Sequence, residues 1–157
     1  MRQNIGEEQL KLSVAASKRG DQAEAEDRAA KAAAVLQLAL DHFRSRDRED
    51  KDMVTSSIRE QRISALLRAR NYAEATRFAS ESIASNPANQ EPMGIHLKTE
   101  ANRLLNAGQL DDTLKLIEAI KAMNPRLADQ YLDQIVAFER QAKEKASAPR
   151  SAVGVGS

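Results

Sequence analysis

The sequence has no cysteine, no tryptophan and few aromatic residues, which make up 3% of its 157 residues. Without cysteine there can be no disulfide bond, no thiolate metal site and no cysteine nucleophile. No apolar run approaches the ~20 residues of a membrane-spanning helix, and the N-terminal stretch MRQNIGEEQLKL lacks the apolar core of a signal peptide. We therefore expect no membrane insertion and a cytoplasmic location, with the periplasm as the alternative if the sequence is part of a longer protein.

An excess of charge of one sign is also missing. The 24 lysines and arginines face 23 aspartates and glutamates, so the formal net charge is +1 at pH 7. Proteins that bind nucleic acids usually have a marked basic excess, because neutralising phosphates supplies much of their affinity. We therefore expect no nucleic-acid partner. RNA binding is a distant alternative, since helical hairpin repeats of another family bind single-stranded RNA.

Motifs of catalysis and metal binding are absent as well. The sequence has no GxSxG, HExxH, GxxxxGK[ST] or GxGxxG. Its two histidines, His42 and His96, lie in different segments and are typical of surface or half-buried helix residues. Neighbouring acids such as Asp111 and Asp112 point about 100° apart on a helix, so they cannot flank one bond. We expect no catalytic residue, no metal ligand and no cofactor, and therefore not an enzyme.

Alanine is abundant, with 27 residues against 18 for valine, isoleucine and threonine together. Alanine is the best helix former and β-branched residues favour strands, so this ratio predicts an all-α fold. Hydrophobic periodicity predicts one helical domain over residues 1–146, with hairpins at 5–44, 53–85 and 93–123 and a single helix at 127–146. The charged stretch 44–52 is a solvated connector or, alternatively, a docking patch. Residues 147–157 are predicted to be a disordered tail or linker.

The helical segments share a repeated phrase, in which a turn is followed by an acidic residue and then a small one. The interval from Arg70 to Pro87 equals that from Gly108 to Pro125, at 17 residues. A proline forces the preceding residue out of the α region, so both prolines mark the end of a hairpin. The phrase predicts helical hairpins that turn at residues 19–21, 70–72 and 107–109.

In these features residues 6–145 resemble the tetratricopeptide repeat family. Leu97 precedes Tyr131 by 34 residues, which is the period of that family. The third hairpin matches best, with large, small, turn and breaker residues at Leu97, Ala101, Leu104, Gly108, Leu110, Ile117, Ile120 and Pro125. The resemblance implies a right-handed α-solenoid of about three hairpins plus a C-terminal capping helix. An irregular helical bundle is the alternative.

The earlier hairpins depart from the family pattern. In the second, Arg59 and Arg62 occupy the places of large apolar residues, and Arg70 replaces the turn glycine. Ile58 and Ile63 sit one place away from the expected stripe, which predicts a rotated or shifted helix. The first hairpin has no closing proline and an overlong second helix.

The last helix is expected to cover the end of the stack. Its apolar residues recur on one face, while charged residues crowd the other. A single hairpin cannot bury its apolar face alone, so a repeat array needs such a cap. The predicted packing places Tyr131, Ile135 and Phe138 against Leu104, Ile117 and Ile120.

The resemblance also implies a binding site, because the first helix of each hairpin lines a concave groove in that family. The predicted groove residues are Glu60, Ser64, Leu67, Lys98, Asn102 and Asn106. A cation beside an amide donor can satisfy an anion by charge-assisted hydrogen bonds, although a solvated polar face is the alternative. We expect a non-enzymatic protein–protein interaction module, a scaffold or adaptor that holds a peptide or protein segment. The alternative is a structural or oligomerisation spacer of a larger multidomain protein, with the alanine-rich helix 21–44 forming a weak homodimer.

Overall fold

Seven α-helices and one short 3-10 helix make up residues 2–44 and 51–148, the parts of the chain that the computed structural model describes. These ranges contain no strand, so the all-α prediction is confirmed for them. In chain order the elements are α1 (Arg2–Lys18), α2 (Gln22–Arg44), α3 (Lys51–Arg68), α4 (Tyr72–Ser85), the 3-10 helix η1 (Pro87–Asn89), α5 (Gln90–Asn106), α6 (Leu110–Lys121) and α7 (Asp129–Ser147).

The helices begin and end close to the predicted positions. The start differs by three residues in two helices: α1 begins at Arg2 instead of at residue 5, and α5 begins at Gln90, directly after η1, instead of at residue 93. Pro92 falls in its first turn, where the missing N–H would have no helical partner in any case. Most of the charged connector (45–50) and of the predicted tail (149–157) lies outside the described residues.

The three turns inside the hairpins share one backbone geometry. Gly20, Arg70 and Gly108 have positive φ angles of 80°, 60° and 74°. In each turn this residue donates its N–H to the carbonyl three residues back, and the next residue donates to the carbonyl five back, at 3.0–3.1 Å. These two bonds are those of a Schellman motif, which satisfies the last carbonyls of a helix. In the second turn, Asn71 Oδ1 then accepts the N–H of Glu74 at 3.3 Å and caps α4.

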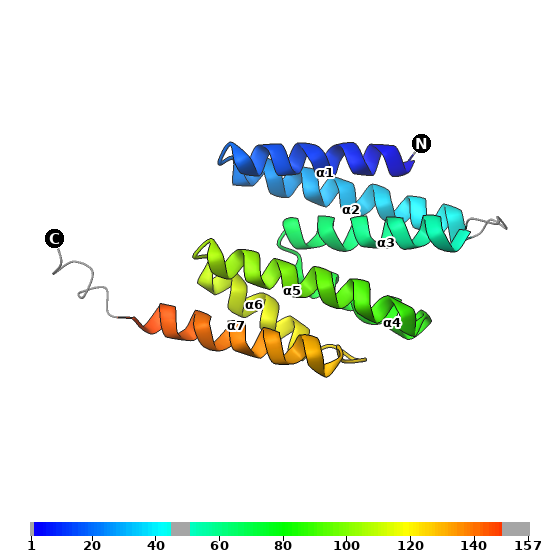
Figure 1. Cartoon of the computed structure of the whole chain (residues 1–157). Coiled ribbons are helices and arrows are strands. Elements are labelled where there is room, and N and C mark those ends of the chain that lie inside the picture. The colour runs from blue at the N-terminus through cyan, green and yellow to red at the C-terminus, as the bar shows by residue number, and fades with distance from the viewer. Residues whose placement is uncertain (1, 45–50, 149–157) are drawn as a thin grey trace.

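Each helix packs against the next one along the chain, and α1, α3, α5 and α7 form a second series of neighbours. α3 contacts both α1 and α5, and α5 also contacts α7, so these helices follow one another down the view of Figure 1. α4 and α6 pack against each other, whereas α2 packs only on α1 and α3 among the described helices. α3 and α5 therefore lie at the centre of the arrangement.

The core is built from aliphatic side chains and alanines. Leu36, Ile58, Leu97, Leu116 and Ile135 are fully buried. Two helical glycines permit close helix contacts: a Cβ on Gly6 would lie 2.6 Å from Leu36 Cγ, and one on Gly94 would lie 2.7 Å from Tyr131 Cδ2. A larger residue at either position would therefore require the Leu36 or Tyr131 side chain to move.

The alanine stripe of α2 faces the interior. Ala25, Ala29 and Ala32 are buried between α2 and its neighbours, and Ser13 of α1 donates a hydrogen bond to the Ala25 carbonyl at 2.5 Å. Small side chains let α1 and α3 approach α2 closely. This stripe is therefore occupied within the chain, whereas Ala23, Ala30, Ala34 and Leu38 on the other side of the same helix are exposed.

The second hairpin shows how α3 accommodates arginine in place of the large apolar residues of the repeat pattern. Ile58 and Ile63 are fully buried, and Arg62 is buried beside them. The Arg62 guanidinium stacks over the Phe78 ring, 4.5 Å from its centroid, and lies 3.7 Å from the Glu74 carboxylate. Burial lowers the pKa of Arg62, and the nearby Glu74 carboxylate partly opposes that change. The arginine therefore acts as a core residue of this hairpin.

α7 packs on α5 and α6 through an apolar face. Tyr131 and Ile135 are buried in the same apolar cluster as Leu104, Ile117 and Ile120. Phe138 is only partly buried, which differs from the expectation that it would bury as fully as the other two. Ala142, one turn further along α7, is fully buried, so the helix stays packed beyond Phe138.

Candidate functional site

The residues predicted on α3 divide between surface and core. The Glu60 side chain is 46% exposed and Ser64 is half-buried, so both can meet a ligand. Leu67 is only 2% exposed and belongs to the main apolar cluster, so it does not line an open surface. The prediction for Leu67 needs correction, because α3 is packed by other helices on more sides than its sequence pattern indicated.

The residues predicted on α5 are accessible. Lys98 is half-buried, and Asn102 and Asn106 are exposed. The Asn106 amide donates a hydrogen bond to Asn102 Oδ1 at 3.4 Å, so the two side chains lie side by side on one face of the helix. Each amide keeps donors and acceptors available, which matches the hydrogen-bonding groups of a polypeptide backbone.

A polar contact joins the two sets. His96 Nε2 of α5 lies 3.3 Å from Glu60 Oε1 of α3, with the histidine side chain 28% exposed. From the sequence, His96 is typical of a surface or half-buried helix residue, and nothing there connects it to Glu60. The two are 36 residues apart, so no local pattern could have paired them.

An apolar cleft between α1 and α3 extends this face. Leu10 and Val14 of α1 form its apolar lining, with Glu7 and Lys11 beside them, and Gln61 of α3 forms the opposite wall. The Gln61 amide donates to Glu7 Oε1 at 2.8 Å and so ties the two helices together. The neighbouring Glu60 reaches α5, so adjacent side chains of α3 contact the helix on either side.

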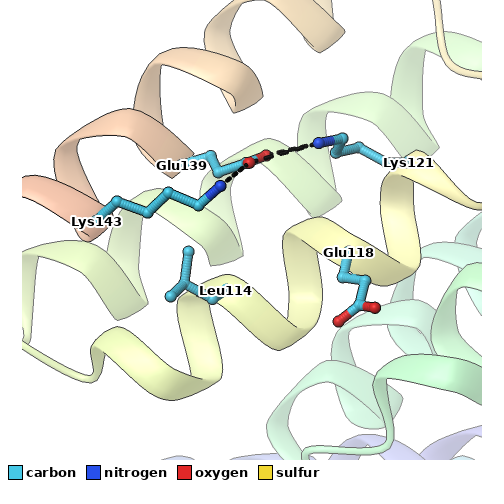
Figure 2. Close-up of a pocket in the computed structure, with 5 residues that line it drawn as sticks. All are labelled: Leu114, Glu118, Lys121, Glu139 and Lys143. Carbon is cyan, nitrogen blue, oxygen red and sulfur yellow. Dashed lines mark hydrogen bonds and ion pairs between the residues drawn. The ribbon is translucent and has the colours of Figure 1, made fainter. Parts of the chain in front are cut away.

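A second depression lies between α6 and α7 (Figure 2). Glu139 of α7 accepts hydrogen bonds from Lys143 at 2.7 Å and from Lys121 of α6 at 3.1 Å, and Leu114 and Glu118 line the α6 side. The Lys143 contact, followed by the Lys121 contact, lowers the pKa of the Glu139 carboxyl. Glu139, Lys121 and Lys143 are thus paired with one another, which leaves them less available to a ligand.

No cluster of three or more histidine, aspartate or glutamate side chains in residues 2–44 and 51–148 could hold a metal ion. None of the helices in those ranges has the length and apolar character needed to cross a membrane.

Comparisons with protein-family models, with curated proteins and with solved structures found no match to this chain.

Proposed function

We propose that this chain is a non-enzymatic protein-interaction module that holds an extended segment of a partner protein on the face made by α1, α3 and α5. Within this proposal the three hairpins and α7 form a tetratricopeptide-like stack with a cap. The repeated turn geometry and the contact series from α1 through α3 and α5 to α7 support that arrangement. The fold would then serve as a scaffold or adaptor.

The observations that carry the proposal are an apolar cleft between α1 and α3 and exposed amides on α5, the next helix that packs on α3. Leu10 and Val14 offer a place for an apolar side chain, and Asn102 and Asn106 offer donors and acceptors for a polypeptide backbone. Protein-binding surfaces commonly combine an apolar centre with a polar rim in this way. The face has charges of both signs, with Glu60 on α3 and Lys98 on α5, so it does not favour a purely acidic ligand.

A display library of random 12-residue peptides tests the proposal. Peptides selected on the parent protein are measured by fluorescence anisotropy against the parent and against the double variant Leu10→Gln/Asn102→Ala. We expect the double variant to bind the selected peptides at least about tenfold more weakly, because it loses both the apolar contact and the amide. Far-ultraviolet circular dichroism checks that the variant remains helical.

Leu38→Gln is the matched control, because Leu38 is 51% exposed on α2, outside the proposed face. It replaces one leucine by glutamine at a surface position and should leave peptide affinity unchanged. Equal loss of affinity in Leu38→Gln, or full affinity in the double variant, would place binding elsewhere. A library that yields no binding peptide would contradict the interaction function itself.

A further inference from the structure

Arg70 differs from the residues at the two equivalent turns. Its φ of 60° lies in the left-handed region, where the first and third turns have glycine at φ 80° and 74°. A residue with a Cβ is disfavoured there, and arginine has no local advantage over glycine. Since the backbone hydrogen bonds are the same in all three turns, the reason for an arginine must lie in its side chain.

The Arg70 guanidinium reaches out of its own hairpin in two directions. Its Nη1 donates to Glu26 Oε1 of α2 at 3.2 Å, and its Nη2 donates to Asp112 Oδ2 of α6. One partner belongs to the first hairpin and the other to the third, 44 and 42 residues away. The fork geometry of a guanidinium permits two such contacts at once, which a lysine ammonium would not reproduce.

The bridge spans helices that do not otherwise touch. Among the described helices, α2 packs only on α1 and α3, and α6 packs only on α4, α5 and α7. The Asp112 side chain is 15% exposed, and the side chains of Glu26 and Arg70 are 34% and 37% exposed. Ion pairs shielded to this degree are screened by salt less than fully exposed pairs.

We propose that Arg70 is a coupling residue, which makes the first and third hairpins open and close together. A displacement of α2 away from the middle hairpin breaks the contact to Glu26, and a displacement of α6 breaks the contact to Asp112. Because both carboxylates share one guanidinium, the loss of one contact changes the position of the group that serves the other. A displacement of the first hairpin thereby changes the stability of the third, and the reverse, and the size of this effect is a coupling free energy between two distant sites.

A double-mutant cycle across the bridge tests this coupling directly. Glu26→Gln and Asp112→Asn are made singly and together, first in the parent and then in the Arg70→Gly background, and urea unfolding is measured for each. In the parent we expect the two substitutions to be non-additive by a factor of at least about three in the unfolding equilibrium constant. In the Arg70→Gly background they should be additive. Additivity in both backgrounds, or the same non-additivity in both, would overturn the proposal.

Hydrogen exchange locates the effect in the chain. Arg70→Gly should fold, since glycine serves the other two turns, and it should raise the exchange rates of α2 and α6 amides, whose helices hold the two lost partners, relative to those of α5. Arg70→Lys retains the positive charge but not the two-pronged guanidinium, so it should show the same change in exchange rates to a smaller degree. Arg77→Ala is the control, because the ion-pair partners of Arg77, Glu74 and Glu81, lie on its own helix. An equal change in all helices would indicate general destabilisation and refute coupling between the hairpins.

Discussion

At the scale of single residues, Arg62 shows that a charged side chain can take a core position. It is 8% exposed, and its guanidinium stacks on Phe78 near Glu74. Holding a charge away from water is costly, and the stacking and the carboxylate only partly offset that cost. Glu74 has a second partner in Arg77 at 2.5 Å, so removing Arg62 would not leave the carboxylate alone.

Arg62→Met is therefore expected to keep the stability of the parent within about 1 kcal/mol, or to raise it, because methionine retains the contact without the buried charge. Arg62→Ala also removes the packing of the long side chain and should cost about 1–3 kcal/mol. Urea unfolding of both variants measures the difference. Equal destabilisation by the two substitutions would show that the charge, and not the packing, is what Arg62 contributes.

Glu139 makes the free energy of unfolding depend on pH in the acid range. Its pKa is lowered by Lys143 and Lys121, so near its ordinary value of 4.5 the unfolded chain binds more protons than the folded one. The stability that this carboxylate contributes is therefore present above that value and is lost as the pH falls through the lower folded-state pKa. We expect the unfolding free energy of Glu139→Gln to fall less steeply than that of the parent between about pH 6 and pH 3.

Unfolding by urea at a series of pH values measures this slope. Glu144→Gln is a suitable control, because it makes the same substitution at an exposed position on the same helix. A control slope that changes as much as that of Glu139→Gln would assign the effect to net charge instead of to the two lysine contacts.

At the scale of elements, the residues of α7 contribute unequally to the stability of the fold. Ile135 is fully buried, whereas Phe138 only borders the apolar cluster. Ile135→Ala should cost about 2–5 kcal/mol, and Phe138→Ala should cost less than the ~3–5 kcal/mol typical of a buried phenylalanine. Denaturant unfolding compares the two variants. A larger loss for Phe138→Ala than for Ile135→Ala would mean that the end of α7 packs more tightly than its exposure indicates.

The turns are the elements that the sequence predicted best. Gly20 and Gly108 mark positions that need a positive φ, and Asn86 before Pro87 is held in an extended conformation. These signals act through the local backbone, so they do not depend on what packs nearby. Arg70 adopts the same conformation without glycine, so the turn there was indicated by the acidic and small residues that follow it and by its distance from Pro87.

At the scale of the whole molecule, α2 has a buried and an exposed side. Ala25, Ala29 and Ala32 are buried within the chain, whereas Ala23, Ala30, Ala34 and Leu38 are exposed. Three alanines and one leucine offer little apolar area compared with the interface of a stable dimer, so we expect a monomer. Sedimentation over a tenfold range of concentration should show one species of 17.3 kDa. A sedimentation coefficient that rises with concentration would contradict the monomer and favour the oligomerisation alternative.

The candidate site could be predicted in part. On α5 the apolar stripe of Leu97, Ala101 and Leu104 is narrow and unambiguous, so the exposure of Asn102 and Asn106 follows from the helical period. On α3 the buried arc is much wider, because α1, α2, α4 and α5 all pack against that helix. Periodicity alone could not show that this arc includes Leu67.

The sequence by itself determined the helical class and the turns, because helix propensity, positive-φ glycines and prolines act over a few residues. Only the tertiary structure decided which side chains meet across the chain. Gln61 reaches Glu7 over 54 residues, and Arg70 joins α2 to α6 over 44 and 42. Such contacts depend on the packing of whole helices against one another, and no local pattern in the sequence encodes them.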